Sequence, residues 1–76
     1  MSKLLTFELD EENNILEIHG NKEGLIFLRN EINALVETKG NDHYHLMTPF
    51  WGGDELSEKK QCQENTLLNH VKIFKW

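Results

Sequence analysis

The chain lacks several features that define whole classes of protein. Its 76 residues include a single cysteine, Cys62, so no internal disulfide can form and a disulfide-stabilised secreted scaffold is disfavoured. No apolar run approaches the roughly 20 residues needed to span a bilayer, and the first residues contain no sustained apolar segment of the kind found in secretory signals. We therefore expect a soluble, cytoplasmic protein that does not bind membranes.

Basic residues are also scarce. Eight lysines and arginines stand against thirteen acidic residues, which gives a formal net charge of −5. Because binding to phosphates requires clusters of Lys and Arg, this balance disfavours nucleic acid as a partner. It suits a basic protein partner, although ordinary solubility explains an acidic surface equally well.

Residues 1–76 are enough for a single small domain and too few for two. Alternating apolar residues predict strands over 4–10 and 15–19, and the polar turn EENN between them predicts a hairpin. Two further strands are predicted over 43–48 and 70–76, where β-branched and aromatic residues are frequent. In the first strand, Leu5, Phe7 and Leu9 would face the core, and Thr6, Glu8 and Asp10 would face the other way.

A helix is predicted between the two pairs of strands, over 22–39, with Asn21 as its N-cap and Gly40 just beyond its end. Gly24 in the first turn would allow the helix to pack closely on the second strand. One apolar stripe follows the helical spacing: Leu25, Leu28, Ile32, Leu35 and Val36.

The order ββαββ predicts an α+β fold, an antiparallel sheet with one helix packed on one face. We expect the helix to cover Leu5, Phe7, Leu9, Leu16, Ile18, Val71 and Ile73. Strands three and four are joined by a long loop, 49–69, and loops of this length in compact domains are usually functional or disordered.

No second helix is available to cover the opposite face of the sheet. By elimination that face would carry His43, His45, Met47, Lys72, Phe74 and Trp76, with His19 and Ile15 as further candidates. Exposed aromatic patches mark interaction sites. A homodimer through this open sheet face is one interpretation.

His43 and His45 lie two residues apart on a predicted strand, so their imidazoles share one face. They could form half of a zinc site with His19 or His70 as a third ligand, or serve a hydrolytic site together with Asp54 and Ser57. No spacing is diagnostic for either chemistry, and the chain is small for a deep pocket. We favour histidines that contact a partner, and we expect no enzyme, no metal and no cofactor.

The stretch PFWGGDE, 49–55, is the most unusual in the chain. Phe50 and Trp51 offer aromatic contact area, and Trp is favoured at the centres of interfaces. Gly52 and Gly53 allow backbone conformations with positive φ. Asp54 and Glu55 make the loop acidic. Trp51 could equally fold back as a plug on the small core, and the two interpretations are compatible.

Three stretches resemble the immunity protein 32 family of bacterial polymorphic-toxin systems: LEIHG followed by EGL (16–25), HYHLMTPFWGGDELS (43–57) and LLNHVKIFKW (67–76). The combination HxHLMT, WGG and ELS is the specific part of the pattern, and the helix is generic. The resemblance implies a small α+β protein that binds and neutralises a cognate toxin domain by forming a stoichiometric complex with it. The predicted partner-binding residues are His43, His45, Phe50, Trp51, Gly52, Gly53, Asp54, Glu55 and Trp76.

Overall fold

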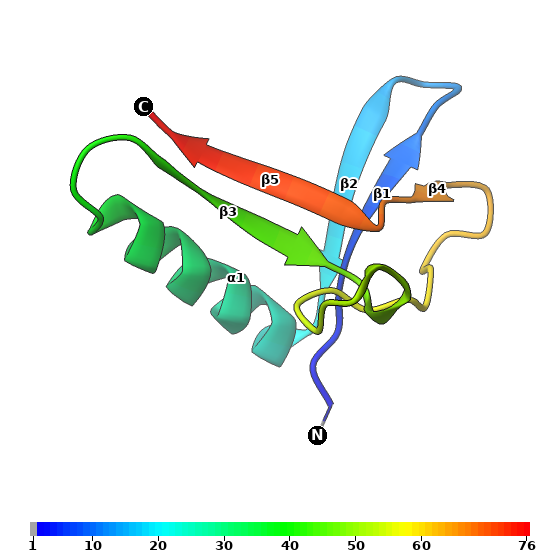
Figure 1. Cartoon of the computed structure of the whole chain (residues 1–76). Helices are drawn as coiled ribbons and strands as arrows, with labels where there is room; N and C mark the ends of the chain where they lie inside the picture. The colour runs from blue at the N-terminus through cyan, green and yellow to red at the C-terminus, as the bar shows by residue number, and fades with distance from the viewer. Residues whose placement is uncertain (1) are drawn as a thin grey trace.

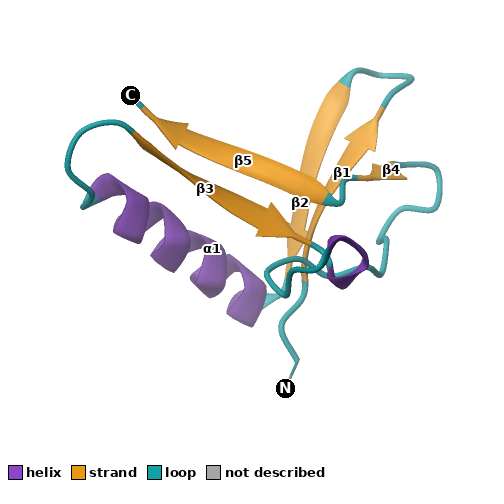
Figure 2. Ribbon diagram, viewed as in Figure 1, coloured by secondary structure: helices purple, strands orange, loops and turns teal. Residues whose placement is uncertain are grey.

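The computed structural model describes residues 2–76, and these form one α-helix and five strands in two antiparallel sheets (Figures 1 and 2). In chain order the elements are β1 (Leu5–Asp10), β2 (Ile15–Gly20), α1 (Lys22–Val36), β3 (Asp42–Met47), the 3₁₀ helix η1 (Pro49–Trp51), β4 (Thr66–Leu67) and β5 (His70–Lys75). The predicted α+β class and the ββαββ order are confirmed, and β4 is a short addition within the predicted loop. Nowhere in residues 2–76 is there a helix long and apolar enough to cross a membrane.

The strands form two sheets, whereas the sequence had suggested one. The first sheet has the order β2-β1-β4, and the second consists of β3 and β5. The split follows from the short strand β4, which occupies the free edge of β1 by pairing Leu67 with Glu8 and Thr66 with Leu9. With that edge filled, β5 pairs along its whole length with β3 instead.

The core lies where the two sheets and the helix meet. Leu5, Phe7, Leu46 and Leu56 form its buried centre. The partly buried residues packed against this centre are Phe27, Leu28, Leu68, Val71 and Ile73. His43 and His45 are exposed, as expected for the open face, whereas Leu46 on the opposite face of β3 is fully buried and Tyr44 is half-buried.

The helix covers less of the apolar surface than its sequence predicted. Within its stripe Leu35 is buried, but Leu25, Ile32 and Val36 are 48%, 42% and 60% exposed. On β2, Leu16 and Ile18 are 53% and 48% exposed, so the expectation that the helix covers them is wrong. The physical reason is the split into two sheets: Figure 1 shows the β1–β2 hairpin extending away from the helix, so the far part of β2 lies beyond its reach.

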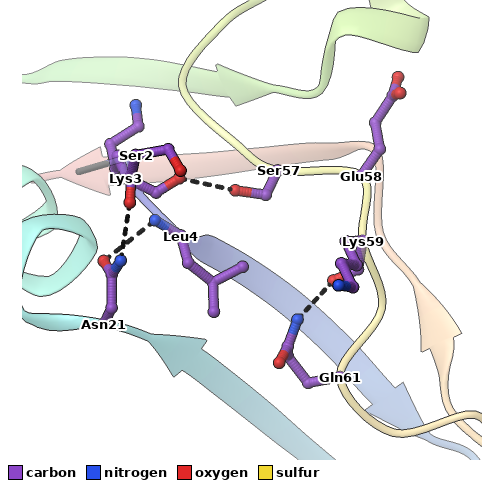
Figure 3. Close-up of a pocket in the computed structure, with 8 residues that line it drawn as sticks. All are labelled: Ser2, Lys3, Leu4, Asn21, Ser57, Glu58, Lys59 and Gln61. Atoms are coloured by element: carbon purple, nitrogen blue, oxygen red, sulfur yellow. Dashed lines mark hydrogen bonds between the residues drawn. The ribbon is translucent and has the colours of Figure 1, made fainter.

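The start of α1 is fixed to the first residues of the chain. The side chain of Asn21 accepts a hydrogen bond from the N–H of Gly24 at 2.8 Å, as an N-cap does, and a second from the N–H of Leu4 at 3.0 Å. Its amide nitrogen donates to the carbonyl of Ser2 (Figure 3). Ser57 accepts from the N–H of Leu5 in the same polar pocket, so one seam joins the N-terminus, the helix and the long loop.

Gly24 is required at this seam. A Cβ atom at position 24 would lie 1.7 Å from the carbonyl oxygen of Leu4, which is far inside contact distance. The close approach predicted for Gly24 therefore exists, but it is to the residue preceding β1. The helix ends at Val36 with Glu37 as its C-cap, three residues before the predicted end, and Gly40 has φ +67° in the following loop.

The second face of β1 is buried, although its alternation suggested a solvent-facing side. Thr6 and Glu8 are both 0% exposed because the long loop packs over them. The Glu8 carboxylate accepts hydrogen bonds from the hydroxyl of Thr6 and from the backbone N–H groups of Gln61 and Cys62, at 2.6, 2.8 and 3.1 Å. The side-chain amide of Asn65 is a fourth donor at 3.2 Å.

These donors determine the ionisation of Glu8. Burial alone raises the pKa of a carboxyl group, but hydrogen bonds that favour its charged form act in the opposite direction. For Glu8 the bonds outweigh burial and lower the pKa from its ordinary 4.5 to about 2. The loop between β3 and β5 is thus held to β1 by a buried carboxylate.

Candidate partner-binding face

The outer face of the β3–β5 ribbon carries a row of aromatic side chains. Antiparallel pairing places His43 opposite Phe74 and Met47 opposite His70, and alternate residues of each strand share a face. Trp51 joins the row from η1, and Trp76 extends it past the end of β5. We call the six residues the ring ladder: His43, His45, Trp51, His70, Phe74 and Trp76.

Neighbouring rings of the ladder are in contact throughout. Their centroids are 5.7 Å apart for Trp51 and His70, 5.0 Å for His70 and His45, 4.9 Å for His45 and His43, 5.1 Å for His43 and Phe74, and 5.7 Å for Phe74 and Trp76. These separations fall in the range in which aromatic pairs attract each other. Mutual contact limits the rotamers of each ring, so less conformational entropy is lost when a partner binds them.

The ladder is open to solvent. Phe74 is 49% exposed, Trp51 55% and Trp76 87%, and the adjacent Phe50 is 80% exposed. Trp51 is therefore not a plug in the core; it rests against His70 and leaves half of its surface free. Exposed aromatic rings held in one row are typical of a surface that binds another macromolecule.

Three histidines occupy the middle of the ladder. Nδ1 of His45 and Nε2 of His70 are 2.8 Å apart, so one of the two rings donates a hydrogen bond and the other accepts it. Partial desolvation and then the nearby charges of His43, His70 and Lys72 lower the pKa of His45. Protonation of the His45 imidazole is therefore disfavoured in the folded protein.

The structure also locates the residues considered for a metal site. His70 lies beside His45, but His19 is on β2 in the other sheet, where its ring contacts Glu17 at 2.7 Å. Cys62 lies in the loop that covers β1, with its N–H bonded to Glu8. Across residues 2–76 no three His, Cys, Asp or Glu side chains are grouped in a way that could hold a metal ion.

The loop after β3 folds tightly beside the ladder. Gly52 has φ +91°, a conformation that favours glycine, and it ends η1 with its N–H bonded to the carbonyl of Pro49. A Cβ on Gly53 would lie 2.7 Å from the Met47 carbonyl oxygen, so this position also needs glycine. Both glycines shape the loop from within, and they allow Trp51 to reach His70.

The two acids of this loop differ in their availability. The carboxylate of Glu55 accepts a hydrogen bond from the N–H of Met47 at 2.9 Å, and this bond holds the pKa of Glu55 below its ordinary value although partial burial opposes it. Glu55 therefore fixes the loop to its own strand. The side chain of Asp54 is exposed, and its backbone carbonyl accepts a hydrogen bond from Lys3. Of the two predicted contact acids, Asp54 is the one directed to solvent.

The sequence placed His43, His45, Trp51 and Trp76 among the candidate residues, and the structure brings these four into one row. The partner-binding residues predicted from the sequence did not include Phe74 or His70, although the alternation of the last strand places both on the same face as Lys72. Phe50, which precedes Trp51 in η1, is exposed, and no contact between its ring and another aromatic ring is found within residues 2–76.

Comparison with protein families finds a match to Immunity protein 32 over residues 15–71. The matched range contains β2, the helix, β3 and the loop, and it includes His43, His45, Trp51 and His70 of the ladder. No curated protein and no solved structure matches the chain.

Proposed function

Because the chain belongs to the immunity protein 32 family, we propose that it binds and neutralises one cognate polymorphic-toxin domain in a stoichiometric protein–protein complex. Membership of this family assigns the chain to toxin immunity in general. The proposal adds the mode of action: an inhibitor that occupies a surface of the toxin in the cytoplasm of the bacterium that makes both proteins.

The observation that carries the proposal is the exposure of the ring ladder. Trp51 and Phe74 are each about half exposed, and Trp76 is almost fully exposed, although each is already oriented by a neighbouring ring. Burying exposed aromatic surface in a partner contributes roughly 25 cal/mol per Å². Residues of this type, held in place before binding, provide most of the energy of many protein interfaces.

Charge supports a basic partner. The chain has a net charge of −5, and the exposed side chain of Asp54 follows Trp51 by three residues in the same loop. Lys72 is the balancing charge on the ladder face, opposite His45 in the pairing of β3 with β5. A toxin surface that combines an apolar patch with one or more basic side chains near Asp54 would fit this arrangement.

The test requires the cognate toxin domain, to be sought among the proteins encoded beside the gene for this chain. Co-expression should rescue growth, and the two purified proteins should form a one-to-one complex. Replacing both Trp51 and Asp54 by alanine should weaken binding by about 2 kcal/mol or more, roughly thirtyfold in Kd. Isothermal titration calorimetry measures the change, and circular dichroism shows whether the variant keeps its fold.

A matched control replaces an apolar residue about as exposed as Trp51 and an acidic residue, both outside the ladder and its loop. The double variant Val36→Ala and Glu12→Ala alters the helix and the hairpin turn, neither of which contributes a ring to the ladder, and it should bind as the wild type does. Full protection by the Trp51 and Asp54 variant would contradict the proposed site. Failure of the wild-type chain to bind or protect against this toxin would contradict the proposed function.

A further inference from the structure

Strand β2 has an open edge. It pairs with β1 on one side through six consecutive residue pairs, from Gly20 opposite Leu5 to Ile15 opposite Asp10, and it is the outermost strand of its sheet. Backbone N–H and C=O groups on the free side are available to another strand. Proteins usually protect such edges with lysine, proline or a β-bulge.

None of these protections is present in β2, whose sequence is ILEIHG. Ile15, Leu16 and Ile18 are 49%, 53% and 48% exposed, so apolar surface is available on both faces of the strand. The other long edge strand that carries exposed apolar residues, β5, contains Lys72 and Lys75. Of these two edge strands, β2 is therefore the less protected against strand addition.

We infer that the free edge of β2 pairs antiparallel with β2 of a second copy of this chain, giving a symmetric dimer with one continuous sheet. A two-fold axis perpendicular to the sheet makes the interface self-complementary. Directly opposed residues must lie on the same face of the joined sheet, so an even-numbered residue can only oppose an even-numbered one, and an odd-numbered residue an odd-numbered one. Two registers centred on the middle of the strand satisfy this rule: one places Ile18 opposite Ile18, and the other places Glu17 opposite Glu17.

One of these registers matches charge and shape. With Ile18 opposite Ile18 of the second copy, Glu17 of each chain lies opposite His19 of the other. Within one chain these two side chains already contact at 2.7 Å and are about a third exposed, 32% for Glu17 and 34% for His19. The dimer would join them into a group of four in which acid and imidazole alternate. The other register places Glu17 opposite Glu17, and opposed like charges are destabilising.

The same register covers apolar surface that the helix leaves open. Leu16 of one copy would lie opposite Gly20 of the other, where there is no side chain. Leu25 occupies the space beside that glycine, because its Cδ2 atom is 3.0 Å from the position of a Cβ on Gly20. Leu16 of one copy would therefore pack on Leu25 of the other, and both are half exposed in the single chain.

The dimer does not depend on the proposed toxin complex. It uses the edge of the β2-β1-β4 sheet, whereas the ring ladder lies on the β3–β5 ribbon, so the ladder remains free in the dimer. A dimer through the open aromatic face would cover the ladder instead. The two arrangements are distinguished by which substitutions separate the copies.

Sedimentation equilibrium of the purified chain, without toxin, should give a mass that rises with concentration and levels off at two copies. Ile18→Lys places like charges in direct opposition at the centre of the interface, so it should raise the dimer Kd at least tenfold. Val36→Lys introduces the same charge at an exposed position on the helix and should leave the Kd unchanged. A chain that remains monomeric at every concentration would overturn the inference.

Cross-linking tests the register. In a Cys62→Ser background, Ile18→Cys should form a covalent dimer on mild oxidation with copper phenanthroline, because directly opposed strand residues have Cα atoms about 4.5–5.5 Å apart. Glu17→Cys should cross-link more slowly. Preferential cross-linking at Glu17 would contradict this register. Dissociation by Trp76→Ala in place of Ile18→Lys would contradict pairing at this edge. Loss of toxin binding in a monomeric Ile18→Lys variant would contradict the independence of the dimer from the ladder.

Discussion

Replacing Glu8 by glutamine should remove a large part of the stability of this domain. The Glu8 carboxylate is fully buried and accepts four hydrogen bonds, two of them from the backbone N–H groups of Gln61 and Cys62. Glutamine has nearly the same shape, but its NH₂ group cannot accept a bond and would face N–H donors. A buried donor that loses its partner costs about 1–3 kcal/mol.

The pKa of Glu8 gives a separate measure of the same effect. In the unfolded chain the group titrates near its ordinary value of 4.5, and in the folded protein near 2. This difference corresponds to about 3 kcal/mol of stability. Because the folded-state pKa is the lower one, the contribution is complete above pH about 4.5 and is lost as the pH falls from there toward 2.

Urea denaturation followed by tryptophan fluorescence at a series of pH values measures both consequences. At pH 7 the Glu8→Gln variant should lose about 3 kcal/mol, which lowers the midpoint by about 3 M urea if the slope is about 1 kcal/mol per M. Between pH 5 and pH 2 the variant should lose less stability than the wild type. Glu12→Gln, in the exposed hairpin turn, is the matched control and should behave as the wild type at each pH. A Glu8→Gln variant within 0.5 kcal/mol of the wild type at pH 7, or one with the same pH dependence, would refute this account of the loop.

Three further predictions concern the seam and the ladder. Gly24→Ala should destabilise the protein by about 2 kcal/mol or more, because the added methyl group meets the Leu4 carbonyl and the resulting clash exceeds the roughly 1 kcal/mol that alanine adds to a helix. Asn21→Ala should cost about 2 kcal/mol, since it removes the N-cap and the acceptor for the Leu4 N–H; thermal or urea unfolding measures both variants. The imidazole of His45 should titrate below 6.5 in an NMR pH series because its ring is partly desolvated and has cationic neighbours, and His70→Ala should raise that midpoint.

Each of these predictions has a control in the chain. Asn30→Ala lies on the exposed side of the helix and should be neutral or slightly stabilising, in contrast to Gly24→Ala. Asn41→Ala changes an exposed loop residue and should leave stability unchanged, in contrast to Asn21→Ala. If the Gly24→Ala or Asn21→Ala variant has the same free energy of unfolding as the wild type, the contacts described for this seam do not stabilise the protein in solution. A His45 midpoint at or above 6.5 would show that the three imidazoles do not influence one another.

The elements were predictable because their signals are local. The alternation of Leu5, Phe7 and Leu9 and the helical spacing around Leu28 are decided by neighbours a few residues away, and the strands and the helix formed close to the expected positions. The separation into two sheets depends on Thr66 and Leu67 taking the free edge of β1. Two residues carry no periodic signal, so this pairing could not be inferred from the sequence.

The candidate face was predictable only in part. Alternation is enough to place His43 and His45 side by side and to put Phe74 on the same face, and the same rule applied to the start of the last strand would have added His70. The contact between Trp51 and His70 depends on how η1 and the two glycines after it turn the chain. The inward direction of Glu55 likewise depends on a backbone N–H that no pattern identifies.

The attachment of the loop to Glu8 has a consequence for biosynthesis. Three of the four donors to this carboxylate lie 53, 54 and 57 residues further along the chain, at Gln61, Cys62 and Asn65. While the chain emerges from the ribosome, β1 and β2 can pair early, but Glu8 must stay hydrated until most of the domain has been synthesised. Contacts between segments so distant in sequence slow folding, so the hairpin edge at β2 would be accessible to chaperones, or to other nascent copies, before the native loop closes.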